Sequence, residues 1–86
     1  MIINCIAVDD EPLALGLVCS FIERTPFLNL VGRYNSAVEA LRAIHSQKVD
    51  VLFLALQLTA LHGIELARVL DNSKTNRPRI IFTTAY

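Results

Sequence analysis

Apolar residues gather in four short runs along the chain, and polar turns or helix-like segments separate these runs. Unbroken aliphatic and β-branched runs of this length are typical of strands that are buried on both faces of a parallel sheet. The pattern therefore predicts four strands, at residues 2–8, 27–34, 49–56 and 79–84.

The first helix is predicted from about Pro12 to Arg24, directly after the acidic segment 9–11. Proline fits the first turn of a helix, and carboxylates favour the positive end of the helix dipole. A Thr-Pro pair at residues 25–26 stops the helix. Between these signals, apolar residues recur at helical spacing: Leu13, Leu17, Val18, Phe21 and Ile22.

Two further helices follow the second and third strands. Ser36 and Glu39 match the capping-box pattern, in which the serine caps the helix and the glutamate reaches back. The expected inner face of this helix has helical spacing and consists of Ala37, Ala40, Leu41 and Ile44. A third helix is predicted from Gly63 to about Asp71.

Strand and helix thus alternate three times before a last strand closes the chain. Alternation of this kind implies right-handed crossovers and a parallel sheet with helices on both faces. With 86 residues and no visible linker or repeat, the chain is predicted to be one α/β domain over residues 1–86.

Composition narrows the classes of function. Apolar residues make up 53% of the chain and charged residues only 19%, which predicts an exposed apolar surface that associates with another molecule. The formal net charge is zero and no basic stripe is present, so we expect no nucleic-acid binding by this chain alone.

The cysteines and the N-terminal run bear on the cellular compartment. Cys5 and Cys19 both lie within apolar stretches, which favours buried free thiols over a disulfide or metal site and indicates a reducing compartment. The run 2–8 ends too soon for a signal peptide or a membrane span. We expect a soluble cytoplasmic protein with no membrane partner.

Residues that could carry chemistry follow the strands, because sites in open α/β sheets form at the carboxyl ends of strands. Asp9 and Asp10 come there first, and paired carboxylates can hold Mg²⁺. The simpler interpretation is that these acids only cap the following helix. His45 and His62 lie on different elements without a third ligand, so we interpret them as surface or loop residues.

Four segments together resemble one known family. They are residues 8–14 (VDDEPLA), 50–54 (DVLFL), 63–67 (GIELA) and 80–86 (IIFTTAY). The chain resembles the receiver domain of two-component response regulators, closest to the branch whose receiver precedes a LytTR-type DNA-binding domain. The resemblance implies a flavodoxin-like (CheY-like) parallel sheet with strand order 2-1-3-4 and three helices. It also implies a parent protein that pairs with a histidine kinase and regulates transcription.

Three site positions of that family carry the expected residue in this chain, and a fourth does not. The acidic pair that holds magnesium matches Asp9 and Asp10, and the hydroxyl that contacts the phosphoryl group matches Thr84. The phosphate-accepting aspartate matches Ala55, which has no nucleophilic oxygen. The resemblance therefore implies no phosphorylation there, no enzymatic activity, and no cofactor beyond a weak, vestigial magnesium site.

Other departures concern the loop after the third strand and the extent of the chain. The loop carries Thr59, Ala60 and His62 where the family commonly has proline, an acid and a small polar residue. The sequence ends at Tyr86, before the family's fourth helix, fifth strand with its essential lysine, and fifth helix. We expect a receiver shortened after the fourth strand, with an open sheet edge.

Open edges and uncovered faces favour pairing with another chain. We expect a homodimer or higher homo-oligomer with an interface formed by Leu54, Leu56, Leu58, Leu61, Ile80 and Phe82. We interpret the sequence as engineered or selected, with a degenerate natural copy as the alternative. Two alternatives stay open. One is a pseudo-receiver that binds a different protein independently of phosphate, and the other, strongly disfavoured by Ala55, is a switch that takes phosphate on Asp9 or Asp10.

Overall fold

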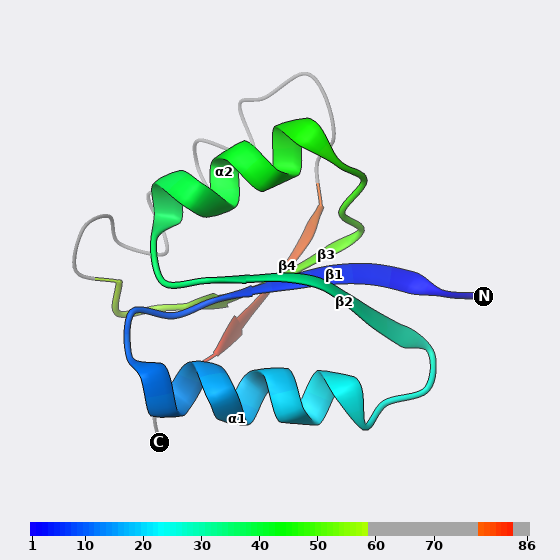
Figure 1. Cartoon of the computed structure of the whole chain (residues 1–86), viewed down its shortest axis with the longest axis horizontal. Helices are drawn as coiled ribbons and strands as arrows, with labels where there is room; N and C mark the ends of the chain where they lie inside the picture. Colours follow the sequence, from blue (N-terminus) through cyan, green and yellow to red (C-terminus); the bar gives the residue numbers. More distant parts are fainter. Residues whose placement is uncertain (59–77, 84–86) are drawn as a thin grey trace.

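The structure is a computed structural model that describes residues 1–58 and 78–83 (Figure 1). The third predicted helix, at Gly63 to Asp71, lies outside these residues. The described elements, in chain order, are β1 (Ile3–Val8), α1 (Pro12–Glu23), β2 (Leu28–Tyr34), α2 (Ala37–Ser46), β3 (Val51–Ala55) and β4 (Arg79–Thr83).

The strands form one parallel sheet in the order β2-β1-β3-β4, which confirms the predicted order. The helix α1 lies on one face of the sheet and α2 on the other, as Figure 1 shows with the sheet seen on edge. The parallel α/β architecture follows from the alternation of strands and helices, because each helix carries the chain back across one face of the sheet.

The bounds of the strands differ from the sequence prediction only at their ends. The strand β2 begins at Leu28 and β3 spans Val51–Ala55, inside the predicted run 49–56. Apolar residues also flank strands, because side chains beyond the last backbone hydrogen bond can still pack on the core. Val49, for example, precedes β3 and is buried.

The start of α1 is capped by an acid, as the sequence indicates. Glu11 is the N-cap residue, and its carboxylate accepts a hydrogen bond from the backbone N–H of Ala14 at 2.8 Å. Pro12 opens the helix. The side of α1 that packs on the sheet is formed by Leu15, Cys19 and Ile22.

The second helix begins at the expected place without the expected side-chain bonds. Ser36 is its N-cap residue, but the serine hydroxyl makes no capping hydrogen bond, so the capping-box prediction is wrong in this respect. The backbone carbonyl of Ser36 accepts the N–H of Ala40 at 3.1 Å. Burial of Ala37, Ala40 and Ile44 stabilises the helix instead, since packing contributes more to a short helix than a cap does.

The core is divided between the two faces of the sheet. On the α2 side, β1 and β3 pack against the helix through Ile6, Val8, Ala37, Ala40, Ile44, Val49, Leu52, Leu54, Ala55 and Leu58. On the α1 side, the buried cluster is smaller and comprises Cys5, Ala7, Leu15, Cys19, Ile22 and Phe53.

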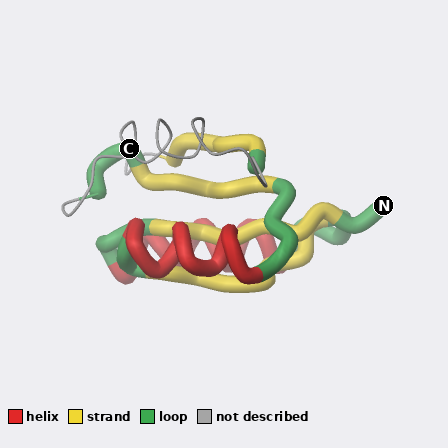
Figure 2. Tube along the Cα trace, turned by 90° about the horizontal axis from the view of Figure 1, so that it is seen from above, coloured by secondary structure: helices red, strands yellow, loops and turns green. Residues whose placement is uncertain are grey.

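The two helices do not cover the whole sheet. Figure 2, seen from above, shows both helices over β1 and β2, with β3 and β4 standing beside them. The strand β4 is accordingly the most exposed one, with Ile81 at 47% and Phe82 at 41% exposure. Within residues 1–58 and 78–83, no helix has the length and hydrophobicity that a membrane crossing requires.

Candidate functional site

The acidic pair lies at the carboxyl end of β1, as predicted. The backbone N–H of Asp9 donates to the carbonyl of Tyr34 at 3.1 Å, which holds the end of β1 against β2. Asp9 is only 8% exposed, and its Oδ1 accepts the backbone N–H of Glu11 at 2.9 Å. Asp10 is half-buried. One carboxylate oxygen of the pair is therefore already used to shape the turn into α1.

Ala55 lies at the carboxyl end of β3, the strand next to β1. Val8 lies opposite Leu54 in the register of β1 and β3, so Asp9 and Ala55 follow at the ends of adjacent strands. Ala55 lies opposite Thr83, whose carbonyl accepts the N–H of Leu56 at 3.2 Å. The side chain at 55 is a methyl group, 6% exposed and part of the α2-side core.

A hollow of about 260 Å³ opens beside these strand ends. It is lined by Asp9, Glu11 and Thr83 and by one flank of α1 with Leu13, Ala14, Leu17 and Val18. The acids at its mouth were predicted, but the apolar wall was not. The signal for the wall is the spacing of Ala14, Leu17 and Val18, which places the three side chains on one flank of a helix.

The described residues test the fit of a magnesium ion at this end of the sheet. Among residues 1–58 and 78–83, no three His, Cys, Asp or Glu side chains are placed to hold a metal ion. The pair Asp9 and Asp10 supplies two carboxylates, and the third position carries the methyl group of Ala55. A tight, closed magnesium site does not fit these residues, and the weak site predicted for the acidic pair stays a prediction.

The predicted interface residues are not all on the surface. Leu54 is 0% and Leu58 is 3% exposed, so both lie inside the core and neither is open to a partner. Leu56 and Ile80 are half-buried, and Phe82 is 41% exposed. Leu54 and Leu58 are buried because they pack against α2, which an alternating pattern of leucines does not reveal. Leu61, Thr84 and His62 lie outside the described residues.

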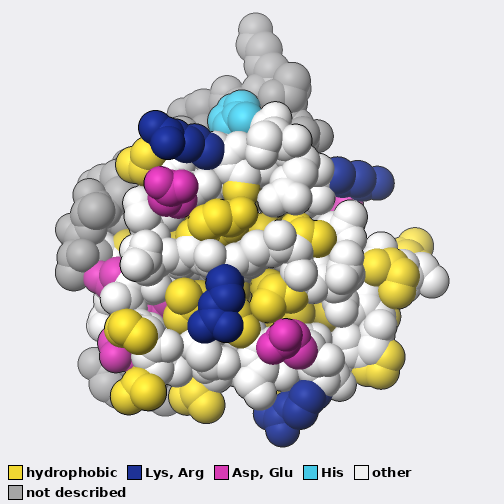
Figure 3. Space-filling view, in the orientation of Figure 1, with side chains coloured by type: hydrophobic (Ala, Val, Ile, Leu, Met, Phe, Trp, Pro, Cys, Tyr) yellow, Lys and Arg dark blue, Asp and Glu magenta, His cyan; other side chains and the backbone are white. Residues whose placement is uncertain are grey.

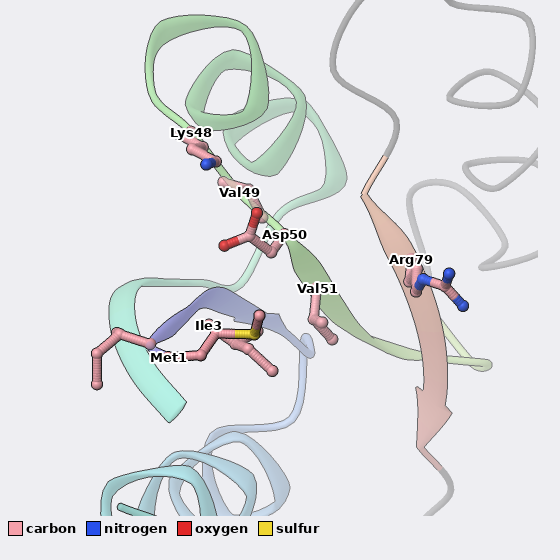
Figure 4. A pocket seen from close by; sticks show the side chains of 8 residues that line it. Met1, Ile3, Lys48, Val49, Asp50, Val51 and Arg79 are labelled. Atoms are coloured by element: carbon pink, nitrogen blue, oxygen red, sulfur yellow. The ribbon is translucent and has the colours of Figure 1, made fainter. Parts of the chain in front are cut away.

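A second hollow, of about 520 Å³, lies at the amino ends of the strands (Figure 4). Asp50 stands at its centre, and its Oδ2 accepts the backbone N–H of Asn4 at 2.9 Å. The backbone N–H of Asp50 donates to Asn4, and its carbonyl accepts the N–H of Arg79 at 2.9 Å. Asp50 thus joins β1, β3 and β4 from its place directly before β3, whereas the Arg79 side chain points away from it (Figure 4).

Charged side chains of both signs are mixed on the face drawn in Figure 3. On the face drawn in Figure 3, Lys and Arg side chains stand singly among acidic and hydrophobic ones and form no basic patch. His45 is exposed on α2, and its Nδ1 lies 2.8 Å from the carbonyl of Leu41. His45 is a surface residue, as predicted.

Both thiols are buried, as the sequence indicates. Cys5 and Cys19 are free and share the α1-side cluster. Burial, first of all, raises the pKa of each thiol above its usual value of 9.0. Neutral, inaccessible thiols of this kind act as small apolar side chains in the core rather than as nucleophiles or metal ligands.

The parallel sheet of order 2-1-3-4, with a helix on each face and an acidic pair after β1, defines the class: a flavodoxin-like α/β domain. The model of the response regulator receiver domain family matches residues 5–86. The chain belongs to the receiver domains of response regulators.

Relatives and solved structures agree with this family. The chain is 38% identical over 84 residues to the transcriptional regulatory protein BtsR of Escherichia coli, and 36% identical to the sensory transduction protein LytT of Bacillus anthracis. Both alignments cover 98% of the chain and 34% of the relative, so the chain spans about a third of these proteins. The response regulatory domain of MrkE from Klebsiella pneumoniae superimposes with a TM-score of 0.84 at 28% identity, covering 98% of this chain and 68% of that one.

Proposed function

We propose that this receiver domain works without phosphorylation and acts by self-association. The observation that carries the proposal is the methyl group of Ala55 at the end of β3, between the ends of β1 and β4. A phosphoacceptor needs a nucleophilic oxygen, and the described side chains place none at that position. The domain is accordingly a binding module of the cytoplasm and not an enzyme.

The other acids at this end of the sheet are poor substitutes. Asp9 is almost fully buried, and its Oδ1 is held by the N–H of Glu11. Glu11 is exposed, but its carboxylate caps α1 through the N–H of Ala14. In each side chain one carboxylate oxygen is thus held by a backbone N–H at the start of α1, which argues against a relocated phosphoacceptor.

Incubation with Mg²⁺ and acetyl phosphate, followed by intact-mass measurement, tests the first half of the proposal. We expect no phosphoryl adduct on the chain. Ala55→Asp is the matched variant, because it restores a carboxylate at the end of β3 and changes no other position. A stable phosphoryl adduct on the unsubstituted chain would overturn the proposal, and peptide mapping would show whether Asp9 or Asp10 carries it.

The proposal of self-association rests on exposed apolar side chains of the described elements β4 and α1. The strand β4 exposes Ile81 and Phe82, and α1 exposes Leu13, Leu17 and Phe21. Apolar surface of this kind in a small domain indicates a partner surface. Sedimentation velocity over about a hundredfold range of concentration tests it, since a self-associating chain shifts towards the dimer as concentration rises. A monomer at every concentration would contradict self-association.

A different protein is the second candidate for the same surface. The names of the relatives favour a larger protein around this domain: BtsR is a transcriptional regulatory protein and LytT a sensory transduction protein. We propose that a full-length parent would regulate transcription and pair with a histidine kinase. We further propose that the sequence is engineered or selected, with a degenerate natural copy as the alternative. A chain that stays monomeric but binds a regulator's other domains, regardless of acetyl phosphate, would favour this second candidate.

A further inference from the structure

The two cysteines of the chain lie on the two elements that pack together on the α1 side of the sheet. Cys5 is on β1 and Cys19 on α1, at 0% and 1% exposure. Both are free, and both belong to the buried cluster that also contains Ala7, Leu15 and Ile22. The function proposed above uses neither thiol.

The lengths of β1 and α1 place the two thiols at the same level of the sheet. Cys5 precedes Val8, the last residue of β1, by about 10 Å along an extended strand. Cys19 follows Pro12, the first residue of α1, by about 10.5 Å along a helix. Because α1 runs back along β1 from the turn at residues 9–11 (Figure 1), the middle of the helix meets the middle of the strand.

The two side chains also point towards each other. Cys5 and Ala7 face α1, whereas Ile6 and Val8 pack in the cluster on the α2 side. Cys19 is on the side of α1 that packs on the sheet. Burial, first of all, raises the pKa of Cys5, and the neighbouring Cys19 raises it further. The small side chains at this crossing allow the helix to approach the strand closely.

We propose that Cys5 and Cys19 form an intramolecular disulfide when a peroxide oxidises the chain, and that this bond staples α1 to β1. The peroxide converts the first thiol to a sulfenic acid: its O–O bond breaks, the sulfur gives up two electrons, and one water leaves. The second thiol then displaces the hydroxyl group of the sulfenic acid, which forms the S–S bond and releases a second water. Two thiols and one hydrogen peroxide thus give one disulfide and two waters.

Cys19 is the thiol that the peroxide oxidises first. The closed chain protects both thiols, so the reaction proceeds when α1 opens locally from the sheet, and this opening carries Cys19 into solvent. Burial raises the pKa of Cys19, but the positive charge of Arg33 lowers it, against a smaller contribution from Glu23. At Cys5, the contributions of Cys19 and Asp50 both add to that of burial. Cys5 therefore acts second, once the helix has closed again.

The disulfide closes the loop of residues 5–19, which contains the acidic turn and the first turns of α1. A cross-link of this kind restricts the unfolded chain and holds the helix on the strand. We therefore expect the midpoint of urea denaturation to rise by about 0.5–1 M in the oxidised chain. Dithiothreitol should return the midpoint to that of the reduced chain.

Treatment of the reduced chain with hydrogen peroxide, followed by intact-mass measurement, tests the proposal. We expect the loss of two hydrogen atoms, no labelling by iodoacetamide after denaturation, and a linked peptide pair that contains Cys5 and Cys19. Cys5→Ala and Cys19→Ala are the matched variants. Cys5→Ala should give a sulfenic acid that dimedone traps, Cys19→Ala should react more slowly, and neither should show the shift in urea midpoint. Circular dichroism confirms that each variant folds.

A second pair of variants tests whether opening of α1 controls the reaction. Ile22→Val weakens the packing of the helix by one methyl group and should raise the rate of disulfide formation by about threefold to tenfold. Leu17→Ala, on the exposed flank of α1, is the control and should leave the rate unchanged. Equal rates for the two variants would contradict the opening of α1 as the controlling step.

The contrary outcomes are distinct from those of the proposed function. Thiols that stay free in excess peroxide, oxidation to sulfinic acid without a linked peptide, or disulfides between chains would each overturn the Cys5–Cys19 staple. An internal disulfide with a lower urea midpoint would also overturn it, because the two thiols would then not face each other in the folded chain. Self-association is measured on the reduced chain, so none of these outcomes decides it.

Discussion

The two outer strands of the sheet, β2 and β4, have opposite surroundings although both have an open edge in the described part of the chain. The strand β2 is covered by α1 on one face and α2 on the other (Figure 1). It also carries the polar residues Asn29 and Arg33 on its surface. The strand β4 has no described helix over it, and its centre is Ile80-Ile81-Phe82.

The edge of β2 has features that discourage pairing with another chain. The register between β1 and β2 shifts after Cys5, which leaves Val31 as an extra residue and bends the edge. The ring of Tyr34 lies against Gly32 on the same strand. Bulges, charged residues and covered backbone are the means by which natural sheets avoid edge-to-edge association. The described residues of β4 include one charged residue, Arg79.

The largest effect that sharpens this comparison is expected from Ile22→Ala, which weakens the packing of α1 on the sheet. Ile22 is 0% exposed between α1 and the sheet, so its truncation should lower the free energy of unfolding by about 3 kcal/mol. Leu17→Ala on the exposed flank is the control and should change it by less than about 0.5 kcal/mol. Urea denaturation measures both, and equal losses would show that α1 packs differently from the structure.

The next effect concerns the protected edge itself. Gly32→Ala places a Cβ about 2.8 Å from ring carbons of Tyr34, so the ring must leave its place on β2. We expect a loss of about 1–2 kcal/mol in unfolding free energy. Gly16→Ala is the matched substitution in α1, where the new Cβ meets nothing within 4 Å, and it should be neutral or stabilising by about 0.5 kcal/mol. A neutral Gly32→Ala would contradict the close approach of the ring.

The attachment of β1 to the residue before β3 depends in part on Asp50, whose carboxylate accepts the N–H of Asn4. Asp50→Ala leaves that N–H without its partner in a half-buried place and should cost about 1 kcal/mol of unfolding free energy. Glu23→Ala, on the exposed side at the end of α1, is the control and should have a smaller effect. Hydrogen exchange locates the loss: the Asn4 amide should exchange faster in Asp50→Ala, and unchanged protection would contradict the bond.

The smallest effect is a decline of stability in alkali. Burial raises the pKa of Cys5 and Cys19 in the folded chain, while the unfolded chain ionises near the usual pKa of 9.0. This contribution to the free energy of unfolding is fully present below pH 9.0. It is lost as the pH rises from there through the folded pKa values, because the thiols of the unfolded chain lose their protons at lower pH than those of the folded chain. Thermal melts of the chain and of a Cys5→Ala, Cys19→Ala variant check this, and identical alkaline slopes would contradict it.

The elements were predictable because their signals are local. Runs of β-branched residues, Pro12 after an acid, and the spacing of alanines in α2 all lie within a few residues of one another. The strand order came from resemblance, since spacing alone does not state which strands are neighbours. The buried side of α1 was not predictable: the helix is apolar around most of its circumference, and the regularly spaced Leu13, Leu17 and Phe21 are the exposed ones.

The candidate site, too, was predictable only in part. Asp9 and Ala55 were placed together correctly, because parallel strands end at the same edge of a sheet. The hollow along α1 was missed, since it depends on how that helix is tilted and rotated over the sheet. Leu54 and Leu58 were predicted to form an interface but lie in the core. They are buried because α2, which is distant in the sequence, packs against them.

By itself, the sequence determined the alternating α/β elements, the acidic turn after β1, and the absence of a nucleophile at Ala55. These are properties of single residues and short segments, which no packing can change. Only the tertiary structure decided which apolar residues are buried, because burial depends on what lies across the sheet. It decided that β2 lies between α1 and α2, whereas Ile81 and Phe82 of β4 are exposed.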